Sequence, residues 1–510
     1  MPRNRLGPLA AFAAFGVFWG TWGVLLPDVK QQVDASVSEL GAALLFISLG
    51  ALPAMVVAGR LSDRLGGRLV APALLLFAGA IVLPGLAHSV VWLGIALVAV
   101  GAASGALDVA INTAATAEEA ASGARFIQIA HALFSAGFLV SALAVGLARQ
   151  AGADPLPVLA GAAALLAGVA WLNAGLPRAP HRAERRRLTV SQRLLVLGIL
   201  CGVAFVVESG IENWSALFLQ EEPGASPAAT GLGPGFFAVA MVIGRTAGQN
   251  LEGRLGERRL FTAGAALAAV GVAVAASASI VPVAVLGFFL GGAGISVAAP
   301  IAFGSAGRGA DPGERGSAVA SVTTVAYLGF LAGPPLIGGV SGAAGLRAGI
   351  GLLAVVAALL ALRTASWQAV LYLFDGNNIL HAGSFRDRRE LVDRLAGHVA
   401  MEGARGVVVF DGVGDDSVVG PLEVRYAAHA DDVVERLAAD HRGREPVTVV
   451  SSDRAIRATA GQETRRVSAK TFLRELKDEP PGPDPLARST VEDALDEETR
   501  RRLEGWRRGY

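Results

Sequence analysis

Twelve long apolar stretches follow one another through residues 1–366, with few polar residues between them. A helix that crosses a bilayer needs roughly 20 mostly apolar residues, and a helix satisfies its own backbone groups in lipid. We therefore expect twelve membrane-spanning helices. Their approximate bounds are 8–27, 40–59, 69–87, 90–112, 127–148, 156–176, 194–218, 233–250, 260–279, 281–303, 317–340 and 346–363.

Charged residues divide the chain into two parts. Residues 1–366 hold 22 Lys and Arg and 17 Asp and Glu, whereas the 144 residues that follow hold 22 and 26. This composition excludes a disordered chain and an ordinary soluble enzyme, and it predicts a membrane domain followed by a water-soluble domain. Cys201 is the only cysteine, so no disulfide can form within the chain.

Basic residues gather on alternate loops. With the N-terminus inside, seventeen arginines fall on inner segments, and only Lys30, Arg149 and Arg347 fall on outer ones. Because loops rich in Lys and Arg stay in the cytoplasm, we expect a multi-pass protein of the cytoplasmic (inner) membrane with both termini in the cytoplasm. The first stretch follows two arginines, as in a signal peptide, but it lacks a convincing cleavage site and is expected to be retained.

A short motif occurs twice, 190 residues apart. Arg-Leu-Gly-Gly-Arg at 64–68 returns as Arg-Leu-Gly-Glu-Arg at 254–258. We predict two six-helix halves, 1–176 and 194–366, joined by a basic cytoplasmic loop at 177–193. Parallel repeats of this kind are typical of rocker-type secondary transporters, whose binding site lies between the halves near the bilayer midplane.

The segment 59–68, Gly-Arg-Leu-Ser-Asp-Arg-Leu-Gly-Gly-Arg, resembles the signature loop between helices 2 and 3 of the major facilitator superfamily. The resemblance covers about residues 6–363 and implies an all-α, twelve-helix transporter of a small-molecule substrate, without a cofactor. Glycine lets helix ends pack closely, and the charges can pair across the cytoplasmic face. The predicted conformational latch consists of Gly59, Asp63, Arg64, Gly66 and Arg68. The alternative is an inner basic loop with incidental glycines.

A finer similarity, to a YbjJ-like subgroup of these transporters, rests on the segments 105–112, 131–135 and 213–216 and on Glu208. In that subgroup an acidic residue is expected where Asn213 stands. This departure weakens any argument that transport needs a carboxylate at that position. The subgroup does not indicate which compound is transported.

Several polar side chains lie inside apolar stretches. A charge at the centre of a membrane helix costs about 2.5–3.5 kcal/mol, so such a residue should face a cavity or a partner. Glu208 and Glu212 are one helical turn apart and share a face, where paired carboxyl groups can carry protons. The candidates for substrate binding or proton coupling are Asp108, Asn112, His131, Glu208, Glu212, Asn213 and Trp214. A structural role, as a hydrogen-bonded or packing residue, stays open for each.

Residues 367–478 alternate short apolar runs with polar, helix-like segments. The runs at 369–374, 406–410, 422–426 and 447–451 are too short to cross a bilayer and predict buried strands. Helices are expected at about 386–402, from 430 onward and at about 468–477. This alternation predicts a small α/β domain with a mainly parallel sheet. The charged segment 479–510 is interpreted as a tail.

Aspartates follow the predicted strands. Asp375, Asp411 and Asp453 follow the first, second and fourth runs, and Asp431 and Asp432 open a helix. Ligands of open α/β sheets bind at the carboxyl ends of the strands, so these carboxylates are expected to converge. Clustered carboxylates without Cys or His suit Mg²⁺ or Mn²⁺, which can activate water and stabilise charge on a phosphodiester. Each aspartate alone could instead be a turn or helix-cap residue.

The order and spacing of these motifs resemble the NYN domain of the YacP-like group, a PIN-like ribonuclease fold. The matching segments are 375–378, 410–412, 430–435 and 451–454, and one departure is Asn377, where the group usually has tyrosine. The resemblance implies metal-dependent cleavage of RNA, with RNA or the ribosome as partner. The expected catalytic residues are Asp375, Asp411, Asp432 and Asp453, with Asp431 as a further metal ligand. The expected RNA contacts are Asn378, Arg386, Arg389 and Arg454.

Three functional hypotheses therefore stay open. The first is a proton-coupled or uniport-type transporter of a small molecule with a cytoplasmic NYN domain. The second is a membrane-tethered, metal-dependent endoribonuclease. The third is a transporter whose NYN domain binds RNA or regulates transport without cleaving. A mistaken join of two adjacent genes would also give this sequence, and sizing of the native protein by immunoblot tests that alternative.

Overall fold

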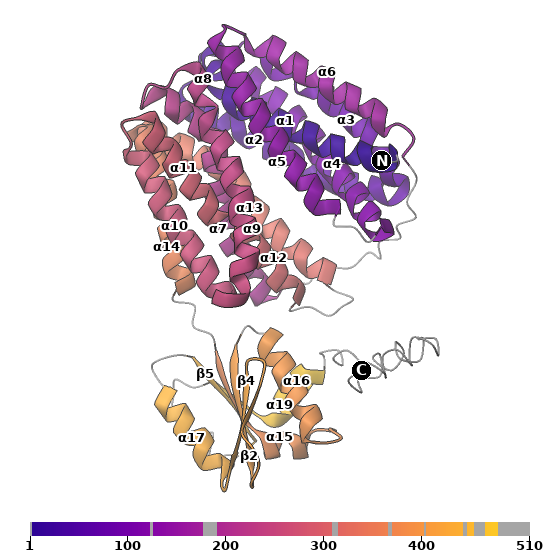
Figure 1. Ribbon diagram of the computed structural model, residues 1–510, viewed down its shortest axis with the longest axis vertical. Helices are drawn as coiled ribbons and strands as arrows, with labels where there is room; N and C mark the ends of the chain where they lie inside the picture. Colours follow the sequence, from indigo (N-terminus) through magenta and orange to yellow (C-terminus); the bar gives the residue numbers. More distant parts are fainter. Residues whose placement is uncertain are drawn as a thin grey trace, which may run out of the picture. The chain divides into compact units, whose positions relative to one another are not determined.

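The computed structural model describes residues 3–122, 126–176, 191–308, 315–365, 370–401, 404–441, 446–452 and 465–477. The chain forms two compact units (Figure 1). The first, which we call the membrane unit, consists of 1–307 with 316–366. The second, the soluble unit, consists of 308–315 with 367–510. Each unit is described by itself.

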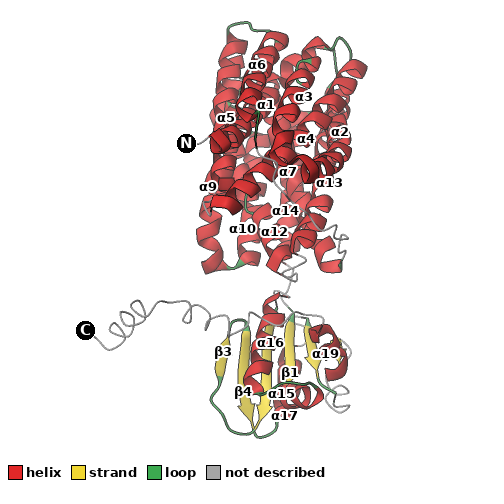
Figure 2. Ribbon diagram, turned by 90° about the vertical axis from the view of Figure 1, so that its right-hand side faces the viewer, coloured by secondary structure: helices red, strands yellow, loops and turns green. Residues whose placement is uncertain are grey.

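The described part of the membrane unit is built of helices (Figure 2). Its first half contains α1 (Arg3–Gln32), α2 (Val37–Leu65), η1 (Gly66–Leu69), α3 (Val70–Ala80), η2 (Leu83–Leu86), α4 (Val90–Ser122), α5 (Phe126–Gln150) and α6 (Pro155–Asn173). Its second half contains α7 (Gln192–Glu221), α8 (Pro227–Thr230), α9 (Leu232–Leu255), α10 (Glu257–Ser277), α11 (Val281–Ile295), α12 (Ala298–Arg308), α13 (Arg315–Ala344) and α14 (Leu346–Ala365).

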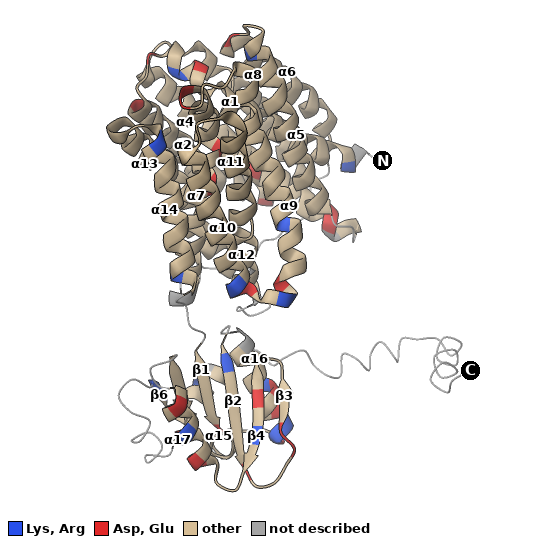
Figure 3. Ribbon diagram, turned by 60° about the vertical axis from the view of Figure 1, so that its left-hand side comes forward, with Lys and Arg blue, Asp and Glu red and all other residues tan. Residues whose placement is uncertain are grey.

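Within the described residues, eleven helical segments are long and apolar enough to cross a membrane. One of them, Val37–Leu86, has 50 residues, about twice the length that a bilayer requires. It contains two helices, α2 and α3, with the 3₁₀ turn η1 between them. All twelve predicted stretches are therefore helical. Only eleven spanning segments are counted because α2, η1 and α3 run on without a break and form one segment. Figure 3 shows that charged residues lie mostly at the helix ends, where water and lipid headgroups can solvate them.

The turns after α2 and α9 show that the repeated motif has a structural basis. Gly66 and Gly256 follow these helices and both have positive φ values, of +55° and +75°. Their N–H groups donate to the carbonyls of Ser62 and Glu252, so each glycine ends its helix in the same way. Only glycine adopts this conformation at low cost, which explains why the motif recurs at equivalent places in the two halves.

Close helix contacts through glycine also recur in both halves. A Cβ atom on Gly16 in α1 would lie 2.0 Å from the carbonyl oxygen of Phe134 in α5. In the second half, a Cβ atom on Gly329 in α13 would lie 1.9 Å from the carbonyl oxygen of Gly202 in α7. The helix pairs α1–α5 and α7–α13 therefore pack backbone against backbone. In membranes small residues serve this purpose, because lipid gives apolar helices little other reason to associate.

The soluble unit contains a six-stranded sheet in the order β3-β4-β2-β1-β5-β6, in which only the β3–β4 pair is antiparallel. The strands are β1 (Leu371–Asp375), β2 (Arg405–Asp411), β3 (Ser417–Val419), β4 (Leu422–Ala427), β5 (Val447–Val450) and β6 (Arg465–Val467). The helices are α15 (Gly376–Ala382), α16 (Arg388–Met401), α17 (Ala430–His441) and α19 (Ala469–Lys477). The predicted α/β class and mainly parallel sheet are confirmed. The short elements β3, β6 and α15 were not predicted.

Helices cover both faces of this sheet (Figure 1). Alternate strand residues point to opposite faces, as the pleat requires. Phe374 and Phe410 pack on one face with Phe472 of α19. Leu373 and Val409 pack on the other face with α17. Because both faces are buried, strands β1 and β2 are continuous apolar runs that end in aspartate, where the chain leaves the sheet.

Candidate functional sites

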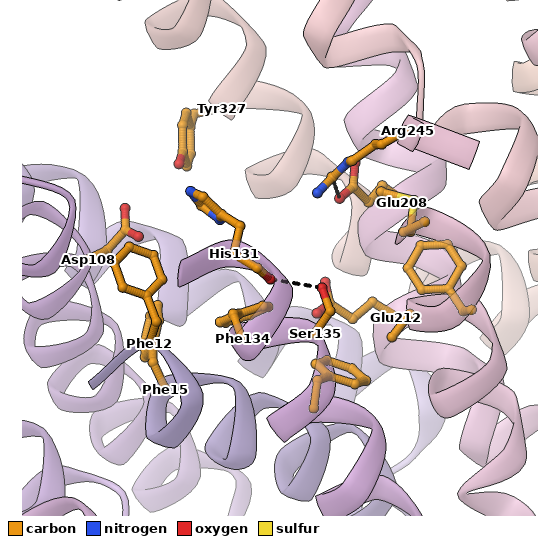
Figure 4. A pocket seen from close by; sticks show the side chains of 14 residues that line it. Phe12, Phe15, Asp108, His131, Phe134, Ser135, Glu208, Glu212, Arg245 and Tyr327 are labelled. Carbon is orange, nitrogen blue, oxygen red and sulfur yellow. Dashed lines mark hydrogen bonds and ion pairs between the residues drawn. The ribbon is translucent and has the colours of Figure 1, made fainter. Parts of the chain in front are cut away.

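A cavity of about 270 Å³ lies inside the membrane unit (Figure 4). Helices of both predicted halves line it: α1, α4 and α5 of the first, and α7, α9 and α13 of the second. The lining residues are Phe12, Phe15, Asp108, His131, Phe134, Ser135, Phe138, Glu208, Glu212, Phe237, Ala238, Met241, Arg245 and Tyr327. The cavity therefore combines a phenylalanine-rich wall with three carboxyl groups.

Glu208 and Glu212 enter the cavity from α7, one helical turn apart. Arg245 of α9 lies close to the first of them, with 3.6 Å between its guanidinium nitrogen and Oε1 of Glu208. The Glu208 side chain is only 16% exposed. Within the described part of the chain, Glu212 makes neither a hydrogen bond nor an ion pair. One carboxyl group of the pair thus has a cation beside it, and the other does not.

Asp108 reaches the cavity from α4. Its Oδ1 accepts a hydrogen bond of 3.0 Å from the amide nitrogen of Asn112, one turn further along the helix. His131 of α5 packs edge-on against Phe12, with 5.1 Å between the ring centroids. Figure 4 shows the imidazole of His131 and the hydroxyl of Tyr327 directed toward each other. Asp108, His131 and Tyr327 thus reach the cavity from three helices: α4 and α5 of the first half and α13 of the second.

Four of the seven predicted transport residues line the cavity: Asp108, His131, Glu208 and Glu212. Asn112, Asn213 and Trp214 do not. Asn213 donates a 2.8 Å hydrogen bond to the carbonyl of Ser209, and Trp214 is fully buried in the apolar core. For Asn213 the reason is helical geometry, because a residue next to Glu212 is rotated by about 100° from it. The sequence analysis missed Arg245, although a charge within the eighth apolar stretch is the same signal that marked Asp108.

The predicted latch lies at the end of α2. Gly59, Asp63 and Arg64 belong to the last turns of that helix, not to a loop, while Gly66 and Arg68 lie in η1. The side chains of Asp63, Arg64 and Arg68 are exposed. These positions agree with a surface that could contact a neighbouring helix end. The role of the segment as a latch stays a prediction.

At the opposite end of the helices, charged side chains form hydrogen bonds that join the two halves. Arg149 of α5 donates to both carboxylate oxygens of Asp28 in α1, at 2.5 Å each. It also donates to Gln220 of α7 at 2.8 Å and to Thr230 of α8 at 2.7 Å. Nearby, Lys30 and Glu221 form a second contact between the halves at 2.9 Å. This end of the bundle, predicted to be the outer one, is thus closed by charged hydrogen bonds.

In the soluble unit, two of the predicted aspartates end neighbouring parallel strands. Asp375 ends β1 and is 4% exposed, and its two oxygens accept hydrogen bonds from the Ser451 hydroxyl at 2.9 Å and the Asn378 N–H at 3.0 Å. Asp411 ends β2 and accepts from the Asn377 amide at 2.8 Å and from the Ala430 N–H at 2.7 Å. Neighbouring strands lie about 4.8 Å apart, so the two carboxylates share one edge of the sheet.

The remaining predicted residues of the soluble unit are less closely grouped. Asp431 and Asp432 lie exposed in the first turn of α17, and Asp453 and Arg454 fall outside the described residues. Among the described residues, no group of three or more His, Cys, Asp or Glu side chains is placed to hold a metal ion. Asn378 accepts from the N–H of Ser452 at 3.0 Å. Arg386 pairs with Glu390 at 3.1 Å, and Arg389 is exposed.

Another arginine of this region, Arg388, contacts aromatic side chains of the sheet. The guanidinium carbon of Arg388 lies 5.3 Å from the ring centroid of Phe410 and 6.0 Å from that of Tyr426. The two rings stack on each other, with centroids 5.8 Å apart. Arg388 is the first residue of α16, and its cation–π contact ties the start of this helix to the sheet.

Comparison with known proteins agrees with this architecture. The two-half, multi-pass helical fold with a cavity between the halves defines a transporter. The model of the Major Facilitator Superfamily matches residues 9–218 and 197–378, and the chain belongs to this family. The model of the YacP-like NYN domain matches residues 366–508, so the soluble unit is a domain of this second family.

Individual relatives give the same result. The chain is 34% identical to an uncharacterized MFS-type transporter of Yersinia pestis over 368 residues, which cover 71% of this chain and 94% of the relative. It is 30% identical over 356 residues to the membrane protein MosC of Rhizobium meliloti, covering 67% and 84%.

Among solved structures, the nucleoside transporter NupG matches with a TM-score of 0.62 at 14% identity, over 71% of this chain and 99% of that one. An inward-facing, occupied bacterial homologue of the human lysosomal transporter Spinster matches with a TM-score of 0.60 at 16% identity, over 71% and 96%. At these identities the likeness shows the shared fold alone. The protein is therefore a multi-pass membrane transporter of small molecules that carries a C-terminal NYN domain.

Proposed function

We propose that this transporter couples the movement of its small-molecule substrate to protons, through the carboxyl groups of the central cavity. The observation that supports this most is the position of Glu208 and Glu212, which share one face of α7 while only Glu208 has Arg245 beside it. An unpaired ionised carboxyl group is costly away from water, and a proton removes that cost. Glu212 is therefore assigned as the proton-carrying group, and Arg245 as the cation that pairs with Glu208.

Alternating access would proceed by movement of one half against the other around this cavity. In the proposed orientation, with both termini in the cytoplasm of the inner membrane, the hydrogen bonds of Arg149 close the outer end. Opening toward the outside then requires Arg149 to leave Gln220 and Thr230 while it keeps Asp28, since Asp28 lies in the same half. The bonds between the halves are thus the ones that change.

Uptake into proteoliposomes tests the transport proposal. The purified full-length protein is reconstituted, and a broad panel of labelled metabolites is supplied under an imposed pH gradient. We expect uptake of at least one compound, and its loss in Asp108→Asn and Glu208→Gln. Glu118→Gln is the matched control, because this glutamate of α4 pairs with Arg5 outside the cavity. Wild-type uptake equal to that of protein-free liposomes over the whole panel would contradict the proposal.

A second proposed activity is metal-dependent RNA cleavage by the soluble unit. Asp375 and Asp411, at the ends of adjacent strands, fit a hydrated Mg²⁺ or Mn²⁺, because Mg²⁺ is commonly held by one or two carboxylates and keeps several waters. Ser451 and Asn377 would orient the two carboxylates. When bound, such an ion would supply an activated water and stabilise charge on the phosphodiester. RNA is the proposed partner, with Arg388 and Arg389 at the start of α16 available for phosphates.

RNA cleavage by the full-length protein in detergent separates the alternatives for this unit. We expect cleavage with Mg²⁺ or Mn²⁺, none after chelation, and loss in Asp375→Asn and Asp411→Asn. Asp440→Asn, an exposed aspartate of α17, is the matched control. RNA binding without cleavage in the wild type would favour the non-catalytic, regulatory alternative. Cleavage that persists in both aspartate variants would contradict the assignment of the site.

A further inference from the structure

The cavity of the membrane unit has an excess of acidic groups. Three carboxyl groups line it, on Asp108 of α4 and on Glu208 and Glu212 of α7, against the single guanidinium of Arg245 on α9. The other titratable groups that face it are His131 of α5 and Tyr327 of α13, neither of which is a permanent cation. Arg245 pairs with Glu208, and among the described residues no cation lies within ion-pair distance of Asp108 or Glu212.

The two carboxyl groups differ in what they contact. Asp108 accepts from the Asn112 amide, which is a neutral donor. Glu212 has no hydrogen-bond or ion-pair partner within the described residues, although it lines the cavity. In the view of Figure 4, Asp108 lies on one side of the cavity and Glu212 on the other, with Phe134 between them. The cavity thus presents negative groups at both sides of an apolar centre.

The remaining wall is strongly aromatic. Six of the fourteen lining side chains carry a phenyl or phenol ring: Phe12, Phe15, Phe134, Phe138, Phe237 and Tyr327. The face of an aromatic ring attracts a cation, and the attraction grows when water is excluded. Aromatic rings also bury apolar carbon efficiently. Carboxylates combined with ring faces are complementary to a cation with an apolar body.

We propose that the transported molecule is a small organic amine, whose ammonium group pairs with Glu212 and whose carbon body packs on the phenylalanines. This inference rests on the proposed transport function. The volume of about 270 Å³ is near the lower end of the range of small-molecule pockets, roughly 300–1,000 Å³, and suits one small molecule. An anion would approach unpaired carboxyl groups of the same charge, and a neutral alcohol would leave Glu212 without a counter-charge.

Proton coupling follows from the same contact. An ammonium group pairs only with the ionised form of Glu212, so the amine and the proton exclude each other at this carboxyl group. Binding of the amine from one side releases the proton, and protonation on the other side releases the amine. In this exchange the carboxyl group of Glu212 is either protonated or paired with the ammonium group. Its charge is neutralised in both states, which the apolar surroundings favour. The transporter is thus an antiporter of protons and organic cations.

Three ligands with one carbon body test the charge preference. Benzylamine, benzyl alcohol and benzoate share a phenyl ring and carry a positive, no and a negative charge at neutral pH. Binding to the purified full-length protein is measured by calorimetry and by the shift of the thermal unfolding midpoint. We expect benzylamine to bind at least about tenfold more tightly than either analogue, as expected when one charged contact distinguishes two ligands.

Variants then locate the contact. Glu212→Gln should weaken benzylamine binding by about tenfold or more and leave benzyl alcohol unaffected, whereas Glu118→Gln should change neither. If Glu212→Gln does not fold, the comparison of the three ligands on the wild type still decides the charge preference. Equal or tighter binding of benzyl alcohol or benzoate would overturn the proposal. Amine binding without any uptake into liposomes would support the cation site but contradict the transport function. Failure of the cation-site proposal can therefore be distinguished from failure of the transport proposal.

Discussion

Arg149 in α5 donates to both carboxylate oxygens of Asp28 in α1 at 2.5 Å, with a side chain that is only 2% exposed. The same guanidinium reaches across to Gln220 and Thr230 in the second half. An ion pair within one half thus also supplies hydrogen bonds to the other half. This arrangement stabilises the state in which the predicted outer end is closed.

Loss of the bonds between the halves should open that end. Gln220→Ala removes one of them and leaves the pair of Arg149 with Asp28 intact. We expect faster labelling of a cysteine at Ser135, in a Cys201→Ser background, by an impermeant maleimide added outside. A charged hydrogen bond is worth about 1.5–3 kcal/mol, so the rate should rise by about tenfold or more.

Arg347 supplies the control for this experiment. It lies at the same end of the bundle and pairs with Glu222 at 2.7 Å, but both residues belong to the second half. Arg347→Gln should therefore leave the labelling rate at Ser135 unchanged. Equal rates in Gln220→Ala and in the background protein would show that the hydrogen bond from Arg149 to Gln220 does not hold this end closed.

The contact between α7 and α13 should not tolerate an added methyl group. A Cβ atom on Gly329 would lie 1.9 Å from the carbonyl oxygen of Gly202, so Gly329→Ala must push the helices apart. Overpacking of this kind costs about 1–3 kcal/mol, and the thermal unfolding midpoint in detergent should fall. Gly351→Ala in α14 is the control, since a Cβ atom there meets nothing within 4 Å. An unchanged midpoint for both variants would contradict the close approach.

Glu390 should make the soluble unit sensitive to acid. The backbone N–H of Arg386 donates to its carboxylate at 2.8 Å and the Arg386 side chain at 3.1 Å, and together they lower the pKa of Glu390 below its ordinary value of 4.5. A lowered pKa in the folded state means that the stabilisation is complete above about pH 4.5 and disappears as the pH falls through the folded-state pKa. Glu390→Gln should therefore be less stable than the wild type at pH 7, and by a smaller margin at pH 3.

Chemical unfolding of the soluble unit, followed at both pH values, measures this difference. Because Glu390 lies at the surface, the effect should be small and should shrink further at high salt. Asp393→Asn on the same helix is the matched control, because this aspartate is exposed. A difference that is the same at pH 7 and pH 3 would show that the carboxylate charge plays no part.

The sequence singles out residues that contrast with their surroundings. Asp108 and Glu208 could be selected because charges inside apolar stretches are costly, and both line the cavity. Phe12 and Phe134 could not, because an apolar residue in an apolar stretch gives no sign of whether it faces lipid, a neighbouring helix or a cavity. Trp214 was selected for its chemistry alone, and its direction around the helix places it in the core.

The soluble unit shows the same distinction. Buried parallel strands are apolar on both faces, so β1 and β2 could be predicted together with the aspartates that end them. The edge strands β3 and β6 have three residues each, too few to form a periodic pattern. The hydroxyl of Ser451 on Asp375 joins residues 76 positions apart, and only the folded sheet brings them together.

The central claim is that carboxyl groups of the cavity couple transport to protons. It is tested most directly by measuring uptake of the transported compound at fixed membrane potential, with and without a pH gradient. The measurement uses proteoliposomes with wild-type protein, Glu212→Gln and Glu118→Gln. We predict that the gradient drives uptake by the wild type and by Glu118→Gln, and that Glu212→Gln loses this gradient-driven component. Wild-type uptake that is the same with and without the gradient, or gradient-driven uptake that persists in Glu212→Gln, would contradict the account.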